Sequence, residues 1–240
     1  LSEWTRNGTE RWRAELAAPL AAIAAGTEYT GLGLVAGGPV VLDGAGEPIE
    51  LQRPPAAVEP VVYAVDVSDA PARFAVTSGV PTESTGADEA FAATVALYEL
   101  ADGRGVPSVR RSIARTGDAA PIVRLFDEGQ TLAYTTWVGH PRFVMLDVGS
   151  GDDAGVDLPH PAIDAVEIGA PRLKAVLSVS SRRDPSRGFA RPSALTLASA
   201  GGRVPVRAEW ASEVSSVAVH DGVVVLRIDD RILALRLGVR

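Results

Sequence analysis

The residues Leu146-Asp147-Val148-Gly149-Ser150-Gly151 decide the fold, because their pattern recurs along the chain. A short apolar strand ends in Leu, Tyr or Trp, four or five residues lead to a Gly, and a second strand follows. Each such hairpin needs a residue that tolerates a positive φ angle, which glycine supplies. The other copies are Trp4–Gly8, Leu42–Gly46, Tyr98–Gly103 and Leu197–Gly201.

The spacing of these copies predicts a repeat architecture. The glycines at positions 8, 46, 103, 151 and 201 lie 38, 57, 48 and 50 residues apart. One four-stranded propeller blade takes about 40–50 residues. We therefore predict an all-β chain that forms a β-propeller of about five four-stranded blades, with six as the alternative. Residues 1–240 are expected to form one such domain.

Alternating and β-branched segments between the hairpins supply the remaining strands. The N-terminal strands within Leu1–Ala17 are expected to close the last, incomplete blade, which removes an exposed sheet edge. Both chain ends, however, offer the same penultimate strand, which leaves a sixth blade or a missing segment open. The expected blades are Leu20–Pro54, Val61–Thr116, Pro121–Pro161, Ala165–Glu213 and the partial Val214–Val239.

Two segments are compatible with helix as well as strand. Thr85–Gly103 has acidic residues near its start, apolar residues at helical spacing and a C-terminal Gly. The repeat instead places a strand at Thr94–Leu100, which we prefer. Glu10–Ala25 has the same ambiguity and is interrupted by Pro19.

Composition excludes several functional classes. The net charge is -7 and the only lysine is Lys174, so no basic face for nucleic acid is expected. No segment is long and apolar enough to span a bilayer. The chain has no cysteine, which excludes disulfides and thiol chemistry. Its Arg, Ala, Val, Gly and Pro content is typical of a GC-rich genome. Because residue 1 is Leu and not Met, we expect that an N-terminal segment was removed, by signal processing or by trimming of the chain. Since the absence of cysteine suits an exported protein, we expect an extracytoplasmic location, either secreted or membrane-anchored, including a lipoprotein.

Three segments resemble PQQ-like and WD40-like (TolB-like) propeller repeats of bacteria. Asn7-Gly8-Thr9-Glu10-Arg11-Trp12 is similar to the Gly-x-x-x-Trp of the tryptophan-docking repeat. Thr131–Trp137 with Arg142–Asp147 resembles paired inner strands, and Ile232–Arg236 resembles a terminal repeat strand. The resemblance implies binding or scaffolding outside the cytoplasm. The quinone cofactor of the longer dehydrogenases is not carried over, and no cofactor is expected.

Candidate chemical groups are few. His140, His160 and His220 lack the spacing of a metal pair, and we interpret them as loop residues. Ser180 and Ser181 have no hydrolase elbow around them. The Asp147–Asp153 turn could gather oxygen ligands for calcium, but it lacks the EF-hand pattern and fits an ordinary hairpin.

A glycosidase needs a pair of carboxylates, and three acidic residues near expected inner strands are candidates for it. They are Asp66, Asp164 and Glu167. No spacing rule connects them, so we assign no catalytic residue and no metal ligand.

The most unusual stretch is Ser181–Pro192, which we call the arginine segment. Arginine suits carboxylates and phosphates, and an aromatic residue beside it is common at binding hot spots. The alternative is a solvated loop that balances local charge. The candidate ligand-binding residues are Arg182, Arg183, Arg187, Phe189 and Arg191.

Two functions follow from these observations. The first is a non-enzymatic extracytoplasmic binding or scaffold propeller that recognises a protein or cell-envelope component, without nucleic acid as partner. The alternative is a glycosidase-like hydrolase that uses carboxylates in the central funnel. An enzymatic activity is therefore left open.

Overall fold

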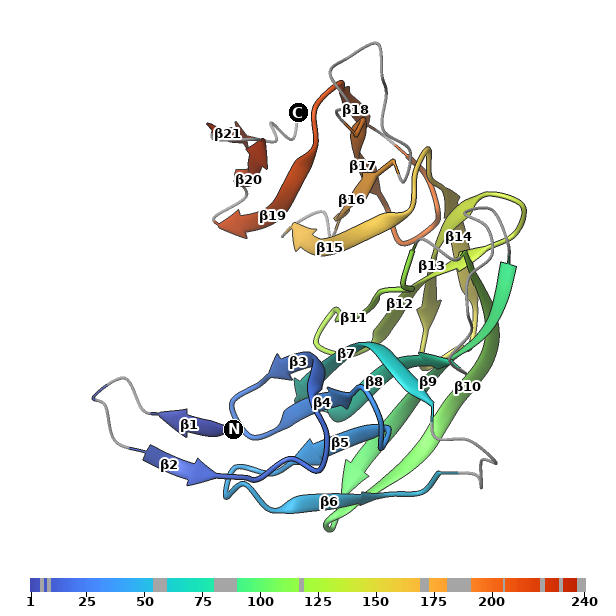
Figure 1. Cartoon of the computed structure of the whole chain (residues 1–240). Coiled ribbons are helices and arrows are strands. Elements are labelled where there is room, and N and C mark those ends of the chain that lie inside the picture. The colour runs from blue at the N-terminus through green and yellow to red at the C-terminus, as the bar shows by residue number, and fades with distance from the viewer. Residues whose placement is uncertain are drawn as a thin grey trace. The chain divides into compact units, whose positions relative to one another are not determined.

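The computed structural model is built from strands and contains no helix among the residues that it describes (Figure 1). These residues are 1–4, 7, 10–53, 60–79, 90–116, 119–168, 173–180, 191–204, 206–220, 223–228 and 231–236. The prediction of an all-β chain is confirmed.

The first eight strands after the N-terminal pair form one sheet with the order β3-β4-β5-β6-β10-β9-β8-β7. It consists of two antiparallel four-stranded halves, sheet 1 and sheet 2, whose outer strands β6 and β10 pair in parallel over two residues. Sheet 1 contains β3 (Leu20–Ala25), β4 (Thr30–Leu34), β5 (Pro39–Leu42) and β6 (Pro48–Leu51). Sheet 2 contains β7 (Val61–Asp69), β8 (Ala72–Gly79), β9 (Ala90–Ala101) and β10 (Arg104–Thr116).

Two further four-stranded sheets and one three-stranded sheet follow in chain order. Sheet 3 contains β11 (Val123–Phe126), β12 (Thr131–Trp137), β13 (Pro141–Asp147) and β14 (Asp153–Asp157). Sheet 4 contains β15 (Ala162–Ile168), β16 (Leu173–Val179), β17 (Ser193–Ala198) and β18 (Val206–Trp210). Sheet 5 contains β19 (Val214–His220), β20 (Val223–Ile228) and β21 (Arg231–Arg236).

These sheets lie in the segments expected from the repeat, except that sheet 4 begins at Ala162 and not at Ala165. The expected strand at Thr94–Leu100 lies inside β9, so the helical alternative for Thr85–Gly103 is wrong there. Glu10–Ala25 contains the strands β2 (Glu10–Arg13) and β3. Strand β1 (Ser2–Trp4) pairs with β2 in a separate two-stranded sheet. Closure of the last blade by these strands, the blade number and the single domain all stay predictions.

By internal contacts the chain divides into two compact units. Unit 1 comprises Leu1–Glu83, Phe91–Ala114 and Val123–Leu132, and unit 2 comprises Ser84–Ala90, Arg115–Ile122 and Ala133–Arg240. Within a unit, the first strands of neighbouring sheets contact one another: β7 contacts β3 and β11, and β15 contacts β19. We therefore call the first strand of each sheet its innermost strand, because neighbouring sheets of one unit contact one another through these strands.

The repeated turn joins the third and fourth strands of sheets 1 to 4. Gly46, Gly103 and Gly151 have φ angles of 85°, 71° and 78°, as the repeat requires. In the fourth copy the positive φ of 74° belongs to Gly202 and not to the predicted Gly201. In two of these turns an aspartate carboxylate also accepts backbone N–H groups: Asp43 in sheet 1 accepts those of Ala45 and Glu47, and Asp147 in sheet 3 accepts that of Ser150.

A second repeated feature lies in the innermost strands. The pairing of the first strand with the second shifts by one residue near its start in β3, β7, β15 and β19. Each shift is a β-bulge, which bends the strand and increases its twist. The bulges follow Leu20, Val62, Ala162 and Val214.

The indole of Trp12 anchors the N-terminal strand pair on sheet 1. Trp12 is buried and packs with Leu32 and Leu42. It also covers Gly46, where an added Cβ atom would lie 2.7 Å from the indole Cγ atom. Gly46 is thus required twice, for its positive φ angle and for the space that Trp12 occupies.

Polar links connect neighbouring sheets inside unit 1. The Asp69 carboxylate on β7 accepts the N–H groups of Thr27 and Glu28 in the β3–β4 turn, at 2.6 and 3.1 Å. The Arg73 guanidinium on β8 donates to the Glu99 carboxylate at 2.9 Å and to the Gly129 carbonyl at 2.7 Å. Charged groups therefore hold the turns of the adjacent sheets in place.

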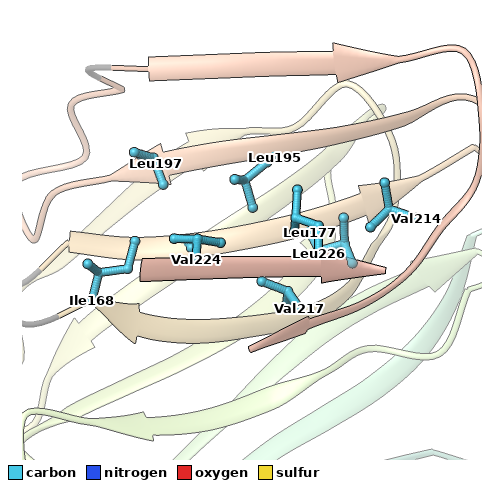
Figure 2. Close-up of a cluster of buried hydrophobic side chains, with 9 residues drawn as sticks. Ile168, Leu177, Leu195, Leu197, Val214, Val217, Val224 and Leu226 are labelled. Atoms are coloured by element: carbon cyan, nitrogen blue, oxygen red, sulfur yellow. The ribbon is translucent and has the colours of Figure 1, made fainter. Parts of the chain in front are cut away.

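Apolar side chains fill the space between sheets 4 and 5 (Figure 2). Every residue of β17 is buried, so this strand has no face exposed to solvent. Such two-sided burial requires a neighbouring layer on each face of the sheet. The labelled members are Ile168, Leu177, Leu195, Leu197, Val214, Val217, Val224 and Leu226.

Exchange of Gly46 for Ala should lower the free energy of unfolding by about 2 kcal/mol or more, because it strains the backbone and displaces Trp12. Gly44→Ala is the matched control. Its Cβ would lie 3.5 Å from the nearest atom, an ordinary contact, so it should cost little. Urea unfolding of both variants is the measurement, and equal losses would contradict this role of Gly46.

Candidate functional site

The arginine segment joins β16 to β17, and most of it lies outside the described residues. This applies to Arg182, Arg183, Arg187 and Phe189. Arg191 is described and half-buried, and its guanidinium binds the Glu213 carboxylate through Nε at 2.9 Å and through Nη2. The hydrogen bond with Glu213 raises the pKa of Arg191. Arg191 therefore has a structural partner, and the binding role of all five residues stays a prediction.

The same end of sheets 3 and 4 carries several connections. Sheet 3 passes into sheet 4 through residues 158–161, so the end of β14 lies beside the start of β15. The start of β15 pairs with the end of β16, and Pro161 O accepts the Val179 N–H at 3.0 Å. The β12–β13 turn, the end of β16, the start of β17 and the β18–β19 connection consequently belong to one rim of unit 2, since antiparallel strands alternate in direction.

Charged side chains gather on this rim around one carboxylate. Asp157 accepts a hydrogen bond from His140 Nε2 at 2.9 Å, and Arg142 Nε lies 4.0 Å from the same oxygen. Arg207 of β18 donates to the backbone carbonyl of Asp157 at 2.8 Å. We call His140, Arg142, Asp157 and Arg207 the rim cluster. It places three basic side chains at a single acidic one.

The rim cluster is exposed at the surface, and a glycine beside it leaves room for the side chain of Arg142. The side chain of Asp157 is 69% exposed and that of His140 49%. Arg142 lies across Gly155, where any Cβ would collide with its guanidinium, so this glycine leaves the space for Arg142. The hydrogen bond from His140 lowers the pKa of Asp157. Near the rim, burial lowers the pKa of His160, against the opposing effect of Glu209.

The acidic residues considered for hydrolysis have structural partners. Asp66 accepts the N–H groups of Val67 and Leu125, at 3.0 and 2.7 Å, and thereby ties β7 to β11. Asp164 accepts the Ala165 N–H at 2.8 Å. Glu167 accepts from Lys174 Nζ at 2.9 Å. No catalytic pair of carboxylates arises from these contacts.

The structure describes only some of the remaining candidate groups. Asp147 Oδ1 accepts the Ser150 N–H at 2.7 Å, which is the geometry of a hairpin turn. Within the described residues no cluster of three His, Asp or Glu side chains suits a metal ion. The side chain of His220 and all of Ser181 lie outside them.

Part of the rim cluster could have been found from the sequence. Counting outward from the β13–β14 turn places Arg142 opposite Asp157, as the register shows. Arg207 comes from another sheet, 50 residues further along the chain, and no local signal connects it to Asp157.

Comparison with known proteins supports the fold. Neither protein-family models nor curated protein sequences match the chain. Among solved structures, the dihydro-heme d1 dehydrogenase NirN in complex with DHE is similar at a TM-score of 0.55 and 10% identity. The match covers 89% of this chain and 44% of NirN, so the chain spans less than half of that protein.

Two more structures are similar to the chain. A protein of unknown function from Bacteroides caccae has a TM-score of 0.53 at 9% identity, over 92% of this chain and 75% of that one. BamB from Moraxella catarrhalis matches 97% of this chain and 87% of its own at 12% identity, with a TM-score of only 0.33. The separate small sheets together with the NirN likeness support a β-propeller fold. In the described part of the chain no helix could cross a membrane.

The contact between Lys174 and Glu167 predicts unequal effects of two substitutions. Lys174 is fully buried, whereas the Glu167 side chain is 31% exposed. Glu167→Ala should cost about 3 kcal/mol, because a buried ammonium loses its carboxylate. Lys174→Met should cost less, because Glu167 can reach water. Chemical denaturation measures the free energy of unfolding of both variants. A larger loss of stability for Lys174→Met than for Glu167→Ala would contradict this role of Glu167.

The low pKa of Asp157 predicts a titration below the ordinary range for aspartate. A carboxyl whose folded pKa is lowered stabilises the fold above its unfolded pKa, and this contribution disappears as the pH falls through the folded pKa. His140→Ala should move the Asp157 pKa upward, because its largest cause is removed. Carboxyl chemical shifts in an NMR titration measure the change. An unmoved Asp157 pKa in the variant would rule out the contribution of His140.

Proposed function

We propose that the chain is a non-enzymatic binding or scaffold propeller that recognises an anionic protein or cell-envelope component. The observation that carries this proposal is the rim cluster, where His140, Arg142 and Arg207 surround one exposed carboxylate of an acidic chain. Loops and strand ends displayed by a rigid scaffold are common binding sites. The arginine segment would extend this surface, since the strand ends that it connects, the end of β16 and the start of β17, lie at the same rim.

The contacts would be charge-assisted. Arginine side chains bind carboxylate or phosphate groups through two parallel hydrogen bonds. In the free protein Asp157 is the single carboxylate beside three basic groups. An anionic group of the partner would bind as a second acceptor for these basic groups. Such a surface increases the rate of association, and its effect decreases as salt screens the charges.

The proposal includes a location outside the cytoplasm and a relationship to PQQ-like or WD40-like repeats of a GC-rich bacterium. The absence of cysteine is compatible with an exported protein, secreted or anchored. The burial of Trp12, the tryptophan of the Gly-x-x-x-Trp stretch, against Gly46 of sheet 1 supports the repeat relationship. This support is limited to the one repeat copy that carries a docking tryptophan.

Binding to immobilised polyglutamate and to vesicles of phosphatidylglycerol tests the proposal for a protein and an envelope component. Arg142→Ser with Arg207→Ser should weaken binding about tenfold at low salt, with an almost unchanged melting temperature. The Arg182→Ser, Arg183→Ser and Arg187→Ser variant should weaken it as well. Arg191 is left intact, because its loss would remove the contact with Glu213.

Arg13→Ser is the matched control, since Arg13 is exposed and forms an ion pair with Glu10 away from these residues in the sequence. It should bind like the unmodified protein. Absence of binding to both probes at low salt, or an equal loss of affinity in the Arg13→Ser variant, would overturn the proposal of an anionic partner.

A further inference from the structure

His140 of the rim cluster lies in the tight turn between β12 and β13. The Val138 N–H donates to the His140 carbonyl at 3.1 Å, and Gly139 between them has a φ angle of 75°. The imidazole donates through Nε2 to the Asp157 carboxylate at 2.9 Å, and about half of the side chain remains exposed. The turn and the carboxylate therefore hold the ring in place at the surface.

The contact with Asp157 fixes which ring nitrogen of His140 carries a proton. An ionised carboxylate only accepts, so Nε2 must donate as long as Asp157 is ionised. The hydrogen bond from His140 lowers the pKa of Asp157, so this carboxylate stays ionised near neutral pH. In the neutral imidazole Nδ1 consequently carries a lone pair and accepts, whereas in the protonated imidazole it donates. A single proton thus changes Nδ1 from an acceptor into a donor.

Arg142 has donors that Asp157 does not use. Arg142 Nε lies 4.0 Å from the Asp157 carboxylate, beyond hydrogen-bond distance, and this buried nitrogen has no hydrogen-bond partner within the described residues. The Arg142 side chain as a whole is only half-buried. Because Nε is covered, an incoming anion would meet the Nη groups of the guanidinium. Arg142 is therefore the group of the cluster that gains most from a second acceptor.

Charged groups from the neighbouring elements lie around this imidazole. β13 contributes Arg142, β14 contributes Asp157 and β18 contributes Arg207. The connection after β14 contributes His160, whose pKa is lowered by burial against the opposing effect of Glu209. The histidine of this connection therefore takes up its proton at a lower pH than an exposed histidine does.

The surroundings of the cluster favour a carboxylate of a protein as the bound group. The basic groups already accommodate one carboxylate, that of Asp157. Val138, in the same turn as His140, is 60% exposed and would contact an apolar side chain of a protein partner. An acidic protein segment with an apolar residue beside its carboxylate fits both features.

We propose that a proton on His140 regulates the rim cluster, which binds a carboxylate of an acidic protein segment more tightly at mildly acidic than at alkaline pH. The carboxylate would accept from Arg142 Nη and, once the imidazole is protonated, from His140 Nδ1. At higher pH the lone pair of Nδ1 would oppose the anion. This inference rests on the proposed function, since it states how binding at the same site is regulated.

The test measures binding of the full chain to immobilised polyglutamate at pH 6 and at pH 8, at the same low ionic strength. Glutamate carboxyls ordinarily titrate near pH 4.3, so the probe stays largely ionised at both values. Binding should be about fivefold tighter at pH 6, the effect of one additional hydrogen bond. In this pH range the groups of the chain that ordinarily change charge are the three histidines and the N-terminal amino group.

Two variants assign the effect to one histidine. His140→Gln keeps an amide donor for Asp157 and cannot take up a proton, so the ratio of its affinities at the two pH values should fall to about one. The double variant His160→Gln with His220→Gln is the matched control. It leaves His140 as the only histidine and should keep the fivefold ratio.

A second measurement needs no variant. Because proton binding and ligand binding are linked reciprocally, added polyglutamate should increase the protonated fraction of His140 at pH 7. The imidazole chemical shifts in NMR spectra report this fraction. Equal affinity at both pH values, a ratio that persists in His140→Gln, or an unchanged protonated fraction would overturn the regulation and leave the proposed function standing. Binding of phosphatidylglycerol vesicles without binding of polyglutamate would overturn the carboxylate partner. Absence of binding to both probes at both pH values would overturn the proposed function as well.

Discussion

Two-sided burial of the middle strands is the constraint on which the structure depends. Every residue of β4 and of β17 is buried, and β16 is buried from Lys174 onward. A sheet with such strands cannot stay in water on either face, so each sheet needs neighbours. Sheets 4 and 5 meet through aliphatic side chains that follow this rule. Propeller packing satisfies it without helices.

Because the middle strands are buried on both faces, few positions can hold a charged side chain. The charged side chains that are present connect neighbouring strands and sheets. Asp66, Asp69 and Arg73 each reach a backbone group of a neighbouring sheet in unit 1. Lys174, the only lysine, is buried beside Glu167 in unit 2. Buried or half-buried charges need such partners because water cannot solvate them fully. Charged residues near the inner strands are therefore explained by structure before catalysis is considered.

Surface charges have a different distribution. The acidic residues of turns such as Asp43 and Asp147 accept backbone N–H groups locally. The basic side chains of His140, Arg142 and Arg207 instead gather around Asp157 on one rim of unit 2, where arginine side chains reach a neighbouring strand or remain in solvent. An acidic protein thus has local basic surfaces, and these are the places where an anionic partner gains most.

The sequence by itself predicted the all-β class, the repeated hairpin turns and, to within a few residues, the segments that form sheets 1 to 4. Turn chemistry explains this, because a glycine with positive φ and the strands beside it are neighbours in the chain. Even there, the sequence placed one positive φ at Gly201, while the structure places it at Gly202. Local residues could not predict the bulges in the inner strands or the parallel contact of β6 with β10. Only the tertiary structure brought Arg207 to Asp157 and gave Asp66 and Glu167 structural partners, since these contacts join residues from separate strands.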